Sequence, residues 1–94
     1  MDDRQFHQIA KTIADPSRLA ALEMIAARGE ASCSEIREHL NLTAATISHH
    51  VKELADSGLV HLRKEAKFLY LTLNTTVWND YLATLRSRIG PASK

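Results

Sequence analysis

Apolar residues recur at every third or fourth position through the first half of the chain, which is the spacing of one helix face. Residues 3–14 are therefore predicted to form a first helix. Its apolar face carries Phe6, Ile9, Ala10 and Ile13. The helix is expected to end at Asp15, which can cap a second helix that begins around Pro16 and ends at Gly29. The apolar residues of the second helix are Leu19, Leu22, Met24 and Ile25.

Two further helices are predicted, separated by a short turn at residues 41–42. Ser32 and Glu35 have the spacing of a capping box, in which each side chain bonds an otherwise unpaired backbone amide, so the third helix is expected to begin there. Thr43 is expected to cap the fourth helix, which ends at Gly58. The apolar line of the fourth helix consists of Ile47, Val51 and Leu54.

Beyond the fourth helix the apolar period changes to two residues, which indicates β-strands. The alternation predicts strands at residues 59–63 and 67–73, joined by a short turn into a β-hairpin. Asn74 and its neighbours are expected to cap a fifth helix, which Gly90 and Pro91 end. One face of this helix carries Trp78, Tyr81, Leu82, Leu85 and Ile89.

The composition favours one soluble globular domain spanning residues 1–94, with a single thin core. No apolar run approaches the roughly 18 residues that span a bilayer, and the acidic start lacks the regions of a signal peptide. We therefore expect a cytoplasmic protein without a membrane partner. The single Cys33 cannot form an internal disulfide. A net charge of +1 neither requires nor excludes nucleic acid as a partner.

The predicted elements are mainly helices with one β-hairpin. Their order, α-α-α-α-β-β-α, is that of a winged helix-turn-helix domain. Four segments along the chain resemble the ArsR/SmtB family of bacterial transcriptional regulators. They are ADPSRL at 14–19, ISHHVKEL at 47–54, SGLV at 57–60 and RKEAKFLY at 63–70. The resemblance covers nearly the whole chain, and it implies a homodimeric repressor whose affinity for a double-stranded DNA operator is changed by an inducer, often a metal ion.

The fourth helix has an apolar face and an exposed face. At about 100° per residue, with Ile47 turned inward, Val51 and Leu54 lie within about 40° of it. His49 then points outward, whereas His50 lies on the edge of the apolar face. Because their directions diverge, the two histidines cannot hold one metal ion as a pair at i and i+4 can. His50 is instead expected to pack and to hydrogen-bond locally.

Side chains near the start of an exposed recognition helix are the ones that reach DNA bases. The residues predicted to contact DNA from this helix are Thr43, Ala45, Thr46, Ser48, His49 and Lys52. Lys52 lies nearer a phosphate, and a methyl group such as that of Ala45 can contact a thymine methyl. An ordinary solvated helix face is the alternative. The family often has Gln where Ala44 stands, so one base contact of its relatives is expected to be missing here.

Basic residues also gather around the predicted hairpin turn. Arg63, Lys64 and Lys67 are offset there only by Glu65, so they are predicted to reach a phosphate or the minor groove. A solubilising role is the alternative. The family usually has Gly where Ala66 stands; because Ala tolerates left-handed backbone badly, a different or less sharply bent turn is expected.

The first and fifth helices carry more large apolar residues than so small a core requires. The residues predicted to form a dimer interface are Phe6, Ile9, Ile13, Trp78, Tyr81, Leu82, Leu85 and Ile89. The resemblance implies that these terminal helices pair across a two-fold axis and place two recognition helices about 34–36 Å apart on palindromic DNA. A fifth helix folded on its own core is the alternative.

Metal sites known in the family are not expected here. Ser32 and Ser34 stand where relatives have Cys-x-Cys, and hydroxyls are poor ligands for soft metals. The fifth helix keeps one carboxylate, Asp80, and no histidine. We therefore expect no metal and no cofactor, and either a small organic inducer or repression set by protein level. Cys33 leaves open a thiol-responsive repressor, although a small buried hydrophobe is favoured because no second cysteine can resolve an oxidised thiol.

Two other classes of function fit the sequence less well. An enzyme is not expected, because the chain has no Gly-rich phosphate loop and no paired-carboxylate motif. A winged helix that binds another protein is compatible with the weak net charge. Binding to random duplex DNA would distinguish the two functions, because only neutralisation of phosphates by the protein makes binding steeply salt-dependent.

Overall fold

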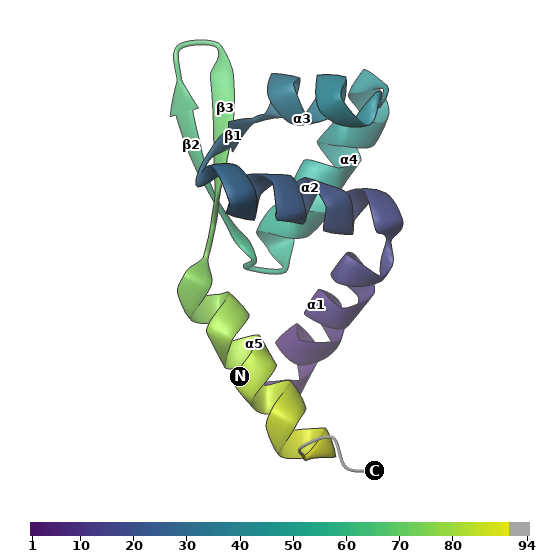
Figure 1. Ribbon diagram of the computed structural model, residues 1–94, viewed down its shortest axis with the longest axis vertical. Helices are drawn as coiled ribbons and strands as arrows, with labels where there is room; N and C mark the ends of the chain where they lie inside the picture. The colour runs from purple at the N-terminus through teal and green to yellow at the C-terminus, as the bar shows by residue number, and fades with distance from the viewer. Residues whose placement is uncertain (91–94) are drawn as a thin grey trace.

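The computed structural model describes residues 1–90, which form an elongated molecule of 46 × 23 × 23 Å. The elements are α1 (Asp3–Ala14), α2 (Pro16–Arg28), β1 (Ala31–Ser32), α3 (Cys33–Leu40), α4 (Ala44–Asp56), β2 (Val60–Glu65), β3 (Phe68–Leu73) and α5 (Thr75–Ile89). In Figure 1, α1 and α5 lie together at one end, while α3, the start of α4 and the hairpin turn lie at the other. This arrangement is a winged helix-turn-helix fold, as the sequence predicted.

The helix boundaries follow the predicted caps. Asp15 caps α2 with its carboxylate, which accepts a hydrogen bond from the Arg18 amide at 2.9 Å. The capping box at α3 is complete, because the Glu35 amide donates to the Ser32 hydroxyl at 3.1 Å and the Ser32 amide donates to the Glu35 carboxylate at 2.8 Å. Pro91, which was expected to help end α5, lies outside the described residues.

The sheet has three antiparallel strands in the order β1-β3-β2, whereas the alternation pattern predicted only the hairpin. The additional strand, β1, contains just Ala31 and Ser32, which pair with Leu71 and Tyr70 of β3. Two residues are too few for any period to be visible in the sequence. The short strand ties the start of α3 to the sheet.

The hairpin turn differs from the prediction in position and in backbone. β2 extends through Glu65, which pairs with Phe68, so the turn consists of Ala66 and Lys67. Ala66 has φ 53°, so the expectation that alanine would avoid left-handed backbone here is wrong. A two-residue turn that matches the twist of its strands requires positive φ, and the strand pairing outweighs a cost of about 1 kcal/mol.

The core lies where α2, α3 and α4 meet the sheet, and it extends to α1, which packs on α2 and α5. Its largest fully buried apolar side chains are Ile9, Ile25, Ile36, Leu54, Leu59 and Leu71. Leu19 was expected on the inward face of α2 but is 39% exposed. Within residues 1–90 no helix has the length and apolar character needed to cross a membrane.

Candidate nucleic-acid interface

The helix-turn-helix consists of α3, the turn at residues 41–43, and α4. The predicted division of α4 into two faces is confirmed, since Ile47, Val51 and Leu54 are buried. The opposite face is exposed and carries Ala45, Ser48, His49 and Lys52. At the turn, Asn41 adopts the left-handed backbone with φ 54°, which asparagine tolerates better than most residues. α4 therefore presents its polar face away from the core.

The first turn of α4 is held by its own threonines. The Thr43 hydroxyl oxygen accepts from the Thr46 amide at 3.1 Å, and the same hydroxyl donates to the Thr46 hydroxyl at 2.9 Å. Thr43 is exposed and Thr46 is half-buried. Since these hydroxyls bond to each other and to the backbone, their first effect is to fix where the recognition helix begins.

Lys52 is not an unpaired cation on this face. Its ammonium lies 2.7 Å from the Asp56 carboxylate one turn later, and this hydrogen bond raises the pKa of Lys52. The helix periodicity places Asp56 on the same outward face, but its pairing with Lys52 was not predicted, although the i, i+4 spacing could have indicated it. A DNA phosphate that binds Lys52 has to compete with this carboxylate.

His50 is buried between α4 and the junction of α1 and α2. Its Nε2 lies 3.8 Å from the Asp15 carboxylate, and its Nδ1 has no hydrogen-bond partner within residues 1–90. Burial lowers the pKa of His50, with Asp15 acting in the opposite direction. The predicted packing is confirmed, whereas the predicted local hydrogen bond is absent from the described part of the chain.

Strand alternation separates the basic residues that the sequence grouped at the hairpin. Arg63 lies 2.9 Å from Glu30 and 3.0 Å from Glu65, with its guanidinium 4.6 Å from the centre of the Tyr70 ring. These carboxylates raise the pKa of Arg63. The expectation that Glu65 alone offsets the cluster is wrong, and no local pattern could have indicated Glu30, which lies 33 residues away.

Lys64 points to the opposite side of the hairpin from Arg63. It pairs across the strands with Leu69, so the two side chains share one face of the sheet. Leu69 lines a groove together with Ser48 and Lys52 of α4. Lys64 is therefore on the same side of the molecule as the exposed face of α4. Lys67, in the turn, has its ammonium 5.6 Å from the centre of the Phe68 ring.

The groove between α3, α4 and β3 has a volume of about 240 Å³ and contains Cys33 on its wall. Burial raises the pKa of the Cys33 thiol, which opposes the thiolate that a helix N-terminus would favour. Ser32 is buried, and its hydroxyl belongs to the capping box, while Ser34 is exposed. In residues 1–90 no three His, Cys, Asp or Glu side chains come together in a way that could hold a metal ion.

The predicted interface residues of α1 and α5 fall into two groups. Phe6, Ile9 and Tyr81 are buried within this chain, and the rings of Phe6 and Tyr81 lie 5.2 Å apart, so they have little surface left for a second chain. Leu82 is 42% exposed and Ile89 is 75% exposed. The half-buried members are Ile13, Trp78 and Leu85.

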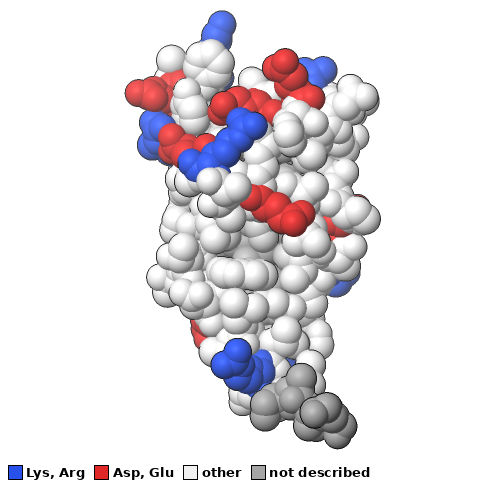
Figure 2. Space-filling model, viewed as in Figure 1, with Lys and Arg blue, Asp and Glu red and all other residues white. Residues whose placement is uncertain are grey.

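Two ion pairs connect charged groups of the N-terminal segment and α5. The amine of Met1 lies 3.3 Å from Asp80, the one carboxylate considered as a metal ligand on α5, and Arg88 pairs with Asp3. Figure 2 shows charged side chains in the upper part of this face and basic ones near the end of α5, with a mostly uncharged surface between them.

Comparison with known proteins places this geometry among DNA-binding proteins. A model of a helix-turn-helix domain matches residues 13–63. The uncharacterized HTH-type transcriptional regulator YceK of Bacillus subtilis is 37% identical over 86% of this chain and 82% of its own length. The arsenical resistance operon repressor of Staphylococcus aureus is 32% identical over 90% of this chain and 81% of its own.

A solved structure shares the fold. The homodimeric winged helix-turn-helix DNA-binding domain Mb0332 of Mycobacterium bovis superimposes with a TM-score of 0.72 at 23% identity, covering 98% of this chain and 92% of its own. The relatives found are transcriptional regulators rather than enzymes.

Proposed function

Because the chain belongs to the ArsR/SmtB-type family of winged helix-turn-helix, DNA-binding transcriptional regulators, we propose that it acts as a homodimeric repressor on a palindromic operator. The S. aureus relative is named as a repressor, which supports the direction of regulation.

The exposed face of α4 is the observation that carries the proposal. Ser48 and His49 are exposed, and no hydrogen bond or ion pair within residues 1–90 engages either side chain. Their donors and acceptors are therefore open to base edges in the major groove. Ala45 supplies a methyl contact on the same face. Thr43 and Thr46 set the position of the helix from which these side chains reach.

Phosphate contacts are assigned to the lysines on the same side of the molecule. Lys52 lines the groove from α4, Lys64 of β2 pairs across the strands with Leu69 at the groove, and Lys67 extends from the hairpin turn. Such contacts hold the protein on DNA without distinguishing sequences. Arg63 has a different role, because its ion pair with Glu30 connects the hairpin to the segment before β1, while Glu65 on the same strand binds the guanidinium as well.

A second copy of the chain is proposed to cover the exposed apolar residues of α5. Leu82 and Ile89 have the largest surface to lose, and the half-buried Trp78 and Leu85 lie on the same helix. The M. bovis relative is described as homodimeric. Two-fold pairing places the recognition helices one DNA turn apart, which is about 34–36 Å.

Metal-driven release is not part of the proposal. The positions of the family's Cys-x-Cys pair hold Ser32 and Ser34, and the Ser32 hydroxyl is engaged in the capping box. Asp80 is paired with the Met1 amine. A small organic inducer and control by the amount of protein remain as the two modes of regulation.

Selection of bound sequences from a random duplex library tests the proposal. The expected outcome is enrichment of an inverted repeat with half-site centres about 10 base pairs apart. Light scattering of the free protein should give the mass of a dimer, and the selected site in front of a reporter gene should lower its expression. Enrichment of no sequence, or of a single unrepeated half-site, would contradict the dimeric operator model.

A further inference from the structure

The exposed surface of α3 has two flanks of different chemistry. Ile36 is fully buried, so at about 100° per residue Glu35 and Arg37 point to opposite sides of the helix. Glu35 faces Arg28 of α2 at 3.6 Å. Arg37 lies one turn after Cys33, which lines the groove shared with the exposed face of α4. Arg37 is therefore on the side of α3 that adjoins the recognition helix.

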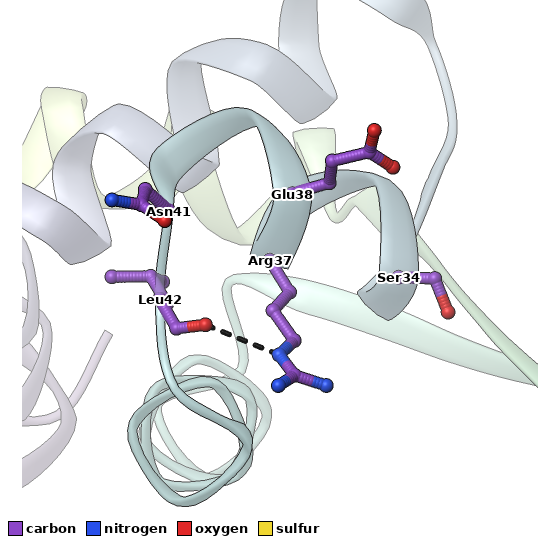
Figure 3. Close-up of a pocket in the computed structure, with 5 residues that line it drawn as sticks. All are labelled: Ser34, Arg37, Glu38, Asn41 and Leu42. Carbon is purple, nitrogen blue, oxygen red and sulfur yellow. Dashed lines mark hydrogen bonds between the residues drawn. The ribbon is translucent and has the colours of Figure 1, made fainter.

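The Arg37 side chain is oriented by the turn between the two helices. Its Nε donates to the Leu42 carbonyl at 3.1 Å, as Figure 3 shows. This bond uses one donor of the guanidinium and leaves the terminal N–H groups available. No carboxylate within residues 1–90 forms an ion pair with Arg37, whereas Arg28, Arg63 and Arg88 each have an acidic partner.

Arg37 forms part of a hollow of about 390 Å³ on the surface of α3. The hollow is lined by Ser34, Arg37, Glu38, Asn41 and Leu42. Figure 3 shows Arg37 and Glu38 pointing in opposite directions, so the carboxylate does not face the guanidinium. Ser34 precedes Arg37 by one helical turn and is exposed. A hydroxyl donor and an oriented guanidinium thus lie next to each other on one helix.

We propose that Arg37, assisted by Ser34, binds a phosphate of the DNA backbone beside the major groove that α4 enters. The inference rests on the proposed DNA-binding function and adds a contact from α3 to those of α4 and the hairpin. A guanidinium already fixed by one hydrogen bond loses less side-chain entropy on binding, and its planar donors match phosphate oxygens. The contact holds α3, the first helix of the helix-turn-helix, against the DNA backbone. It is independent of base sequence.

Salt titrations of binding to a fluorescent random-sequence 30-base-pair duplex test this inference. Arg37→Gln is expected to reduce the slope of log K against log salt by about one, and to weaken binding about eightfold at 0.1 M salt, as loss of one phosphate contact predicts. Arg28→Gln is the charge-matched control, because Arg28 of α2 lies beside Glu35 on the opposite flank of α3. It should keep the wild-type slope.

Two outcomes would overturn the Arg37 contact while leaving the proposed function intact. These are a wild-type slope for Arg37→Gln, or an equal loss of slope for Arg28→Gln. Arg37→Lys keeps the charge without the Nε bond and should retain most of the slope; a lysine variant as weak as the glutamine variant would make the role structural. Wild-type protein that binds duplex without salt dependence would instead remove the proposed function.

Discussion

At the scale of single residues, His49 and His50 show how one step along a helix separates two roles. His49 is exposed on the polar face of α4, while His50 is only 6% exposed and faces the Asp15 carboxylate at 3.8 Å. The rotation of about 100° between neighbouring helix residues accounts for the difference. One imidazole is available to a ligand of the protein, and the other is part of its interior.

His49→Ala should lower affinity for the selected operator by about 1–3 kcal/mol, because one base-edge contact is lost while the fold is unchanged. Affinity for random duplex should change little. Lys52→Ala is the comparison, since loss of a phosphate contact should weaken all sequences alike. Fluorescence anisotropy with both duplexes measures this, and operator affinity equal to wild type for His49→Ala would remove His49 from base recognition.

His50 should make stability fall in mildly acidic solution. Burial lowers the pKa of His50 from its ordinary 6.5, so the unfolded chain takes up this proton before the folded chain does. The stabilisation is thus present above about pH 6.5 and is lost as the pH falls toward the lower pKa of the folded state. Asp15 also has a lowered pKa, caused chiefly by the hydrogen bond from the Arg18 amide. It affects the pH dependence of stability only below its ordinary pKa of 3.8.

Urea denaturation between pH 7.5 and pH 5 tests this expectation on matched neighbouring histidines. His50→Leu should flatten the fall in the free energy of unfolding with decreasing pH. His49→Ala is the control variant, because it removes an exposed imidazole from the same helix. A His50→Leu profile as steep as that of the wild type would assign the acid sensitivity to other groups.

At the scale of elements, the hairpin distributes its cations by strand geometry. Successive residues of a strand point to opposite faces, so Arg63 reaches Glu30 and Tyr70 while Lys64 lies beside Leu69 at the groove. Adjacent basic residues in the sequence thereby serve different surfaces. The hairpin can be braced on one face and bind phosphate on the other.

Lys64→Ala and Arg63→Ala should separate these two roles. Lys64→Ala is expected to weaken binding to every duplex and to lower the salt slope by about one. Arg63→Ala is expected to keep the slope and to lower the melting temperature, because Glu30 and Glu65 lose their shared partner. Salt titration and thermal denaturation of both variants measure this. A slope lowered equally by Arg63→Ala would return Arg63 to the DNA interface.

At the scale of the whole molecule, the two ends of the long axis have different surfaces. The hairpin turn and the start of α4 lie at one end, with α1 and α5 at the other (Figure 1). The second end exposes Leu82 and Ile89. Pairing of two chains through that end would leave both recognition helices accessible, which is the geometry that an inverted repeat requires.

Leu82→Glu should convert the dimer to a monomer, because it places a charge in the apolar contact between the chains. Leu19→Glu is a close control, since Leu19 on α2 is 39% exposed and Leu82 is 42% exposed. Both variants should fold, and only Leu82→Glu should lose mass in light scattering and most of its operator affinity. Wild-type protein that is monomeric at tens of micromolar would contradict the dimer.

Zinc, cadmium and arsenite at micromolar free concentration should change operator affinity by less than about tenfold. Soft metals require thiolates that Ser32 and Ser34 cannot supply, and burial raises the pKa of the Cys33 thiol, which disfavours its thiolate. Operator titrations with each metal, repeated on Cys33→Ser, measure this. A tenfold metal effect that disappears in Cys33→Ser would show that Cys33 recruits further ligands, including the same residue of a second chain.

The sequence by itself determined the features that depend on near neighbours. Asp15, Ser32 and Thr43 cap their helices through hydrogen bonds to residues three positions away, so the pattern alone located these boundaries. The outward direction of His49 follows from helix periodicity. The order of the helices and the hairpin and the exposed face of α4 were therefore predictable, since both arise from local hydrogen bonding and side-chain spacing.

Tertiary structure alone decided the features that depend on distant segments meeting. Ala31 and Ser32 form a strand because β3 lies beside them. Arg63 pairs with Glu30, which lies 33 residues earlier in the sequence. Ala66 entered left-handed backbone because paired strands fix both ends of its turn. In each case a contact between segments distant in the sequence stabilises the observed conformation. Its free energy outweighs the conformational preference of the local residues, so the local sequence could not indicate it.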